Sequence, residues 1–352
     1  MSTAPVLEAV AVPASAIGRY FSVLSVVPSA LFTAYAFALL ASGASGGGPD
    51  WQRSAAAFAG LGLAGLAALS LASVLVGLLL HPLQYSLVQV CEGYWGSGDA
   101  PVRAMRRRVI RHQRLFDQLQ RRRGAAAHAL DAAGQSPGDP DAPPVGEDNI
   151  GHLTVLGETG RALGRYPRDR NDIRPTRLGN VLRRHEADAG AAYALPGVTV
   201  VPHLALVAPP ADVAYLDDQR TQMDLSVRLA VLSALATALT VAVMWRAGLW
   251  VLLALAPYAA AYVFYRGAVG QAQGYGTAIM VLVDLNRFAL YERLRVPLPV
   301  DLAQERRTNV QLGRLLRDLE PVSLKVAGGP RAADDPPAPA VGLAPADPPA
   351  GL

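Results

Sequence analysis

Two long uncharged stretches open the chain. No charged residue occurs between Arg19 and Asp50, and none between Arg53 and Glu92. The first interval contains the apolar run YFSVLSVVPSALFTAYAFALLAS, and the second contains AAAFAGLGLAGLAALSLASVLVGLLL. About 20 apolar residues in a helix cross the roughly 30 Å hydrocarbon core of a bilayer. The pattern therefore predicts two transmembrane helices that form a hairpin around the turn GASGGGPD.

A second hairpin is predicted between Arg228 and Arg266. Arg246 divides this interval into LAVLSALATALTVAVMW and AGLWVLLALAPYAAAYVFY. The alternative is one continuous helix over residues 229–265. It would leave an arginine in mid-membrane, which costs at least about 2.5 kcal/mol on insertion scales. We therefore place Arg246 in a tight turn between two spans.

The distribution of arginine predicts the orientation. Two hairpins put the N-terminus, the central region and the tail on one side of the membrane. The outer turns carry Arg53 and Arg246, whereas residues 98–225 hold most of the remaining arginines. Because Lys and Arg are enriched in cytoplasmic loops, we expect a multi-pass protein of the bacterial cytoplasmic (inner) membrane with both termini in the cytoplasm.

The predicted fold is an all-α integral membrane protein with four transmembrane helices in two hairpins. Cytoplasmic helical extensions and a disordered linker and tail complete it. The expected divisions are a cytoplasmic N-terminus (1–19), a first hairpin (20–80), juxtamembrane and basic amphipathic helices (81–123), a flexible linker (124–149), a cytoplasmic helical region (150–225), a second hairpin (226–266), cytoplasmic amphipathic helices (267–326) and a disordered tail (327–352).

Residues 103–123, RAMRRRVIRHQRLFDQLQRRR, predict a basic amphipathic helix. Apolar positions follow a 3-4 spacing that includes Val102, Met105, Val109, Phe116 and Leu119, as in a helical seam or short coiled coil. Basic residues near a cytoplasmic membrane surface gain about 1 kcal/mol each from anionic lipid. The stripe could instead pack on protein. The candidate contacts to anionic lipid or to a partner are Arg103, Arg106, Arg107, Arg108, Arg111 and Arg114. No aromatic stacking platform accompanies them, so nucleic acid is not predicted.

A second arginine-rich segment is PTRLGNVLRRHEADAGAAYAL, predicted as a helix capped by Thr176. Its arginines could bind an anion at the helix start; these are Arg174, Arg177, Arg183 and Arg184. The alternative is that they are solvated or paired with Glu186 and Asp188, while Leu178 packs inward. The following PGVTVVPHLALVAPP is broken by prolines and predicts an extended or looped segment. Residues 211–230 predict a helix that leads into the third span.

Composition and motifs argue against a soluble protein and against several kinds of catalytic, cofactor and metal site. Hydrophobic residues make up 51% of the chain and charged residues 17%, against about 25% charge in soluble domains. The only lysine is Lys325, outside any Walker A pattern, and the only cysteine is Cys91. GLGLAG, at residues 60–65, matches the dinucleotide fingerprint but lies within a predicted transmembrane helix, where glycines favour helix packing. The histidines lack metal-ligand spacing. No cofactor, metal site or catalytic residue is predicted.

Three segments carry a resemblance: QYSLVQVCEGYWG, PTRLGNVLRRHEADAGAAYALPGVTVVPHL and VDLNRFALYERLRVPLPVDLAQER. Together they resemble a family of bacterial polytopic membrane proteins to which no function is assigned. The resemblance covers most of residues 80–315, with the linker as a variable insertion. It implies a shared architecture and brings no catalytic residues.

The sequence leads to one functional expectation and one alternative. We expect a non-enzymatic membrane scaffold, sensor or accessory component that acts through its cytoplasmic helical region. Its expected contacts are membrane lipids, anionic ones among them, and protein partners or further copies of itself. The alternative is an oligomeric channel or transporter. The predicted spans contain no Asp, Glu, Lys or Arg, which disfavours ion-coupled transport.

Overall fold

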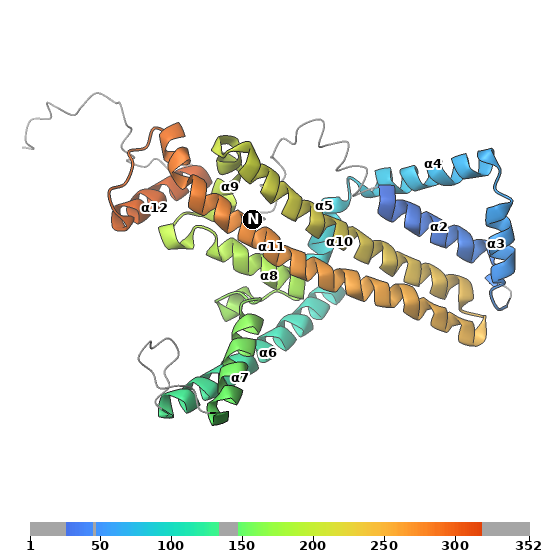
Figure 1. The fold of residues 1–352 in the computed structure, drawn as a ribbon, viewed down its shortest axis with the longest axis horizontal. Helices are drawn as coiled ribbons and strands as arrows, with labels where there is room; N and C mark the ends of the chain where they lie inside the picture. Colours follow the sequence, from blue (N-terminus) through green and yellow to red (C-terminus); the bar gives the residue numbers. More distant parts are fainter. Residues whose placement is uncertain (1–25, 45–46, 134–146, 319–352) are drawn as a thin grey trace, which may run out of the picture.

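The computed structural model describes residues 26–44, 47–133 and 147–318 (Figure 1). Within these ranges the chain contains helices, turns and loops, and no strand. The α-helices are α2 (Val27–Ala41), α3 (Trp51–Ala59), α4 (Leu63–Leu80), α5 (Gln84–Glu92), α6 (Asp99–Ala132), α7 (Glu147–Leu163), α8 (Arg177–Asp188), α9 (Gly197–Val207), α10 (Pro210–Met244), α11 (Leu255–Arg293) and α12 (Leu302–Asp318). The predicted N-terminal segment 1–19 and tail 327–352 lie outside the described residues.

The central element is the antiparallel pair α10 and α11, which runs through most of the length of the molecule (Figure 1). The two helices are joined by a turn that contains Arg246 and a short 3-10 segment, Gly248–Ala254. Arg246 places its guanidinium over the ring of Trp245, 4.6 Å from its centroid. The prediction of a turn at Arg246 is confirmed, as is the helix that leads from residue 211 into the third apolar stretch.

Three helical stretches among the described residues are long and apolar enough to cross a membrane. They are Leu63–Leu80, Pro210–Met244 and Gly248–Arg293. The first predicted span is described only over Val27–Ala41, which is shorter. A bent pair, Arg177–Tyr193 with Gly197–Val207, also passes on composition when its two parts are taken together, but is bent by 72°. The all-helical class agrees with the prediction, and the three long apolar stretches coincide with the second, third and fourth predicted spans.

The second apolar stretch was predicted as one helix and is broken instead. Gly60 ends α3 and Gly62 precedes the first residue of α4, where its extended backbone (ψ −179°) interrupts the helix. The prediction that GLGLAG lies within a transmembrane helix is therefore wrong for these two glycines. Only Gly65 is helical there, and a Cβ on it would meet Leu61 of its own segment. The physical reason is local, since glycine stabilises helix interiors poorly.

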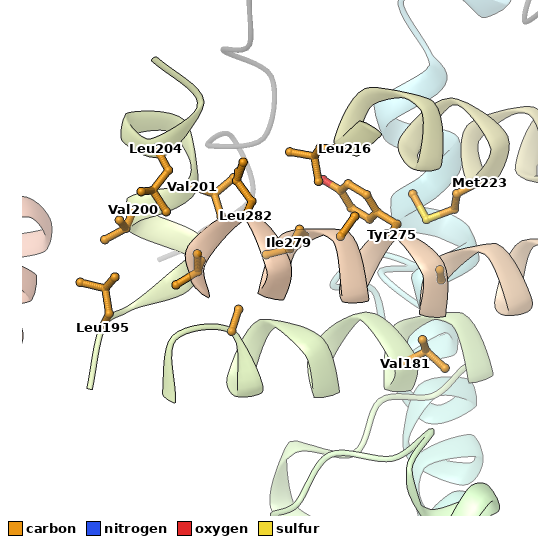
Figure 2. Packing of buried hydrophobic residues seen from close by; sticks show 14 of the residues in the cluster. Val181, Leu195, Val200, Val201, Leu204, Leu216, Met223, Tyr275, Ile279 and Leu282 are labelled. Atoms are coloured by element: carbon orange, nitrogen blue, oxygen red, sulfur yellow. The ribbon is translucent and has the colours of Figure 1, made fainter. Parts of the chain in front are cut away.

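At the opposite end of α10 and α11 lies a compact hydrophobic core. Leu178 and Val181 of α8 and Leu282 and Val283 of α11 belong to it, all at most 2% exposed. Figure 2 shows Tyr275 on α11 directed toward Leu216 and Met223 of α10, with the α9 side chains beyond. We call this end of the molecule, made by α5–α9, α12 and the adjoining parts of α10 and α11, the polar half.

Most of residues 196–210 form a helix and not the predicted extended or looped segment. α9 spans Gly197–Val207 and contains Pro202 in its interior. Proline removes one backbone hydrogen bond from a helix. Here the buried side chains Val200, Val201 and Leu204, each at most 2% exposed, pack against the core. Burial of this apolar face outweighs the helix-breaking tendency of the proline.

Helix α12 is fixed to α11 by a buried polar network. The Tyr291 hydroxyl donates to Asn309 Oδ1 at 2.7 Å, and Asn309 Nδ2 donates to the Tyr193 carbonyl at 3.0 Å. Arg287 Nε forms an ion pair with Glu305 at 2.9 Å. Tyr291, Asn309 and Glu305 are all buried. The network satisfies polar groups that would otherwise be costly to bury.

Within the polar half, helices α6 and α7 form an arm that leaves the hydrophobic core at an angle to α11 (Figure 1). The predicted linker 124–149 is partly wrong, because α6 continues to Ala132 and α7 begins at Glu147. Phe116 of the predicted stripe is buried with Tyr166 and Ile173, and Leu119 packs beside them. Val102, at the other end of the stripe, is 44% exposed. The stripe is therefore docked on protein in its second half.

Candidate functional site

The site lies where α5 and α8 meet, and two glycines allow a very close approach there. Gly93 follows α5 with a φ of +107°, and a Cβ on it would lie 2.3 Å from Pro175. A Cβ on Gly179 would lie 2.2 Å from the carbonyl oxygen of Glu92. That oxygen accepts a hydrogen bond of 2.7 Å from the Thr176 hydroxyl. The segments CEGYWG and PTRLGN thus form one closely packed junction.

The start of α8 is fixed by side-chain hydrogen bonds. The Thr176 hydroxyl accepts from Gly179 N–H at 3.0 Å, which confirms Thr176 as the predicted N-cap. Asn180, 1% exposed, donates to the carbonyl oxygens of Arg174 and Thr176 at 3.0 and 2.7 Å. Its Oδ1 accepts from Arg174 N–H at 2.7 Å. Asn180 therefore determines the path of the chain into Arg177.

Helix α11 is joined to the same junction. The Leu178 N–H donates to the Tyr265 hydroxyl at 3.4 Å. Gly276 of α11 faces α8 so closely that a Cβ there would lie 2.1 Å from the ring of His185. These contacts place the end of the uncharged stretch 247–265 next to the start of α8.

An arginine-rich cavity of about 910 Å³ opens between this junction and α6. We call it the arginine cavity. Its lining comes from α5 and the following loop, α6, the start of α8, and α11: Val90, Cys91, Trp95, Arg107, Arg108, Ile110, Arg111, His112, Arg114, Leu115, Gln118, Pro175, Thr176, Arg177, Tyr262, Tyr265 and Arg266. Six of these residues are arginines, and none is Asp or Glu.

A smaller second cavity of about 320 Å³ adjoins the first. Both cavities are lined by Leu115, Arg177 and Arg266. The second cavity adds Arg165 and an apolar wall from α7, α8 and α11 that includes Val181 and Val269. No acidic residue lines the second cavity either.

The charge in the arginine cavity is not neutralised by described residues. None of its six arginines forms an ion pair with an acid in the described part of the chain. Burial and the positive charges of Arg177, Arg108 and Arg111 lower the pKa of His112. His112 Nδ1 lies 2.9 Å from the Tyr166 hydroxyl. The arrangement favours a negatively charged ligand.

The structure divides the ten arginines predicted as contacts. Arg107, Arg108, Arg111 and Arg114 line the arginine cavity with Arg177, whereas Arg103 and Arg106 lie outside its lining. The remaining three lie elsewhere on or near α8. Arg174 packs over the ring of Tyr94 at 5.5 Å, Arg183 pairs with Asp172 and Glu186, and Arg184 pairs with Asp188.

Sequence reasoning missed Arg266 and Arg165. Arg266 was recognised only as the charge that ends the fourth apolar stretch, and Arg165 lies in a loop with no motif. The position of Arg266 at a predicted membrane boundary was the one available signal. Its distance from α6 and α8 along the chain concealed its place in the cavity.

Two half-buried acids, Glu92 and Glu186, belong to the same junction. Burial, followed by the charge of Glu186, raises the pKa of Glu92 to about 7, and Arg174 opposes this shift. The pKa of Glu186 is also raised, mainly by burial. Burial and the neighbouring Glu92 raise the pKa of the Cys91 thiol to about 11. Cys91 is therefore a neutral thiol at physiological pH, without the thiolate that nucleophilic chemistry requires.

Comparisons with protein-family models, with curated proteins and with solved structures find no match to this chain. The resemblance to a family of bacterial polytopic membrane proteins therefore stays a prediction. In the described residues, no group of three or more His, Cys, Asp or Glu side chains could hold a metal ion.

Proposed function

We propose that the protein is an integral membrane protein of the bacterial cytoplasmic membrane. The two apolar hairpins lie in the bilayer, and the polar half lies in the cytoplasm. There it acts as a non-enzymatic scaffold or sensor that receives an anionic ligand in the arginine cavity. The chain's separation into exposed apolar helices and a polar half with unneutralised arginines carries this proposal.

The exposure of the apolar helices supports membrane embedding. In the most apolar 18-residue stretch of Leu63–Leu80, only 11% of the residues are buried. In the corresponding stretch of Gly248–Arg293, only 6% are buried. Leu63, Leu71 and Leu79 of α4 are 61–89% exposed. Soluble monomers rarely expose a contiguous apolar surface of more than a few hundred Å². A bilayer removes this surface from water.

The shape of the polar half supports a scaffold or sensor. The arm of α6 and α7 extends from the core (Figure 1), and its arginines are exposed on α6. An extended charged surface joined to a rigid junction suits recognition of a ligand or partner. The Cys91 thiol is unsuited to nucleophilic catalysis, as described above.

Cysteine labelling tests the membrane topology. On a Cys91→Ser background, Gly47→Cys marks an outer turn and Gly151→Cys marks α7 in the polar half. Both glycines have open space for a side chain. We expect a membrane-impermeant maleimide to label only Gly47→Cys in intact spheroplasts, and both variants after permeabilisation. Labelling of Gly151→Cys in intact spheroplasts, or release of the protein by an alkaline wash, would contradict the proposal.

Proteoliposomes separate a scaffold from a channel. The purified full chain is reconstituted, and efflux of a trapped ion or small solute is followed by fluorescence. The scaffold proposal expects the liposomes to stay sealed at every protein density tested. Protein-dependent efflux would contradict it and support an oligomeric channel or transporter.

A further inference from the structure

The arginine cavity has the chemistry of a phosphate site. We infer that it binds a phosphate-bearing anion and that the headgroup of an anionic membrane lipid supplies this phosphate. The inference rests on the proposed function, because a lipid reaches the cavity only if the hairpins lie in a bilayer. The lipid would fix the angle of the basic helix α6 relative to the membrane.

The charge of the cavity favours an anion. Arg107, Arg111, Arg177 and Arg266 converge on it from three helices, and no acid lines it. Like charges held close together repel one another, so a bound anion would relieve the repulsion. Guanidinium groups present a planar pair of donors that matches phosphate oxygens, and arginine is enriched in such sites for this reason.

The position of the cavity along α11 favours a lipid as the source of the phosphate. Tyr262, Tyr265 and Arg266 mark the end of the uncharged stretch 247–265. Tyrosine and tryptophan concentrate at the level of the lipid headgroups, where one side of the ring is apolar and the other is wet. Tyr258 and Tyr262 are 61% and 56% exposed. They give a lipid chain a surface that leads from the bilayer to the arginines.

The size of the cavity and the fixed backbone at its edge suit a ligand larger than a free phosphate ion. A volume of about 910 Å³ is far larger than one inorganic phosphate and lies within the range of sites for small organic ligands. The backbone at Arg177 is held by the close contact between Gly179 and Glu92 and by the three hydrogen bonds of Asn180 to Arg174 and Thr176. A binding group held in place before the ligand arrives loses less entropy on binding.

Native mass spectrometry of the full chain in detergent provides the test. One arm titrates phosphatidylglycerol against phosphatidylcholine, and a second arm titrates inorganic pyrophosphate. The cavity variant is Arg177→Gln with Arg266→Gln. Its matched control is Arg103→Gln with Arg106→Gln, which removes the same charge from exposed positions outside the cavity lining.

We expect the full chain to retain phosphatidylglycerol in preference to phosphatidylcholine. The cavity variant should lose this preference by about tenfold or more in affinity, whereas the control should change it by less than about twofold. If the cavity variant elutes as an aggregate, Arg107→Gln with Arg111→Gln replaces it, because these α6 positions are exposed.

Three results would overturn the inference. Equal losses in the cavity variant and the control would show general surface charge and no site. Tight pyrophosphate binding that needs Arg177 and Arg266, without lipid preference, would overturn the lipid source and assign a soluble phosphate. If the full chain prefers neither phosphatidylglycerol nor pyrophosphate, the cavity is not a phosphate site. None of these results alters the cysteine labelling, so failure of the site and failure of membrane insertion are distinguishable.

Discussion

Helices α6 and α8 are both rich in arginine, but their arginines have different surroundings. On α8, Arg183 forms an ion pair with Asp172, with 3.2 Å between Nη2 and Oδ1, and Arg184 forms an ion pair with Asp188. On α6, the cavity arginines have no described acid as partner. Arg177, in the first turn of α8, lines the cavity with them.

The difference teaches that arginine content alone does not identify a binding surface. Arg183 and Arg184 of α8 have acids within one helical turn or in the preceding loop, so their charge is neutralised locally. On α6 itself, the Asp117 carboxylate pairs with Arg170 Nε at 3.0 Å and not with a cavity arginine. The net local charge decides whether such a helix attracts an anion.

The largest expected effect is at the junction that brings α8 to the cavity. Gly179→Ala places a Cβ against the Glu92 carbonyl, where the distance would be 2.2 Å. We expect a loss of about 1 to 3 kcal/mol in the free energy of unfolding, the usual cost of overpacking. Thermal unfolding in detergent measures it.

The control is Gly124→Ala, the same change in an α-helix with no atom within 4 Å of the added Cβ. Alanine should be neutral there or stabilise α6 by up to about 1 kcal/mol. Equal stability of the two variants would show that the close packing of α5 and α8 is not needed.

A smaller effect on stability, dependent on pH, is expected from Glu92, the half-buried acid of the junction. The folded protein raises the pKa of Glu92 from its ordinary value of 4.5 to about 7. Below pH 4.5 the carboxyl is protonated in both states, and its contribution to stability is complete. As the pH rises toward 7, the unfolded state ionises first, so this contribution is lost. Glu92→Gln should therefore reduce the fall in stability between pH 5 and pH 8, by about 1 to 2 kcal/mol.

Unfolding temperatures across this pH range measure the effect. Because Glu186 is itself buried and near Glu92, the variant should retain a shallower slope of the same sign. The exposed Glu158 of α7 supplies the control, since Glu158→Gln should leave the slope unchanged. A full slope in Glu92→Gln would show that the ionisation of Glu92 is not coupled to folding.

The smallest expected changes in stability come from single arginine substitutions that compare α8 with α6 directly. Arg184→Gln removes a partner from Asp188, so stability should fall by about 1 kcal/mol or less. Arg111→Gln removes one of several clustered positive charges, so in lipid-free detergent stability should stay unchanged or rise by a few tenths of a kcal/mol. Chemical unfolding at low salt gives both values. A drop of the same size in both variants would show that the two helices do not differ.

The local sequence determined much of the architecture. Uncharged stretches gave the apolar helices, Arg246 gave the turn, and Thr176 gave the start of α8, because each signal acts within a few residues. The prediction failed at Gly60 and at Pro202, where the balance of local propensity and packing was different. A glycine pair broke an apolar helix, and buried valines kept a proline within one.

By itself, therefore, the sequence determined the helical class, the apolar stretches and the arginine-rich character of residues 103–123. Only the tertiary structure decided which arginines share a cavity. Arg111, Arg177 and Arg266 lie on three helices far apart in the chain, and they meet because Gly93 and Gly179 let α5 and α8 pack closely beside α11. Whether a charge is neutralised depends on which side chains surround it in space, and this depends on contacts that no local pattern encodes.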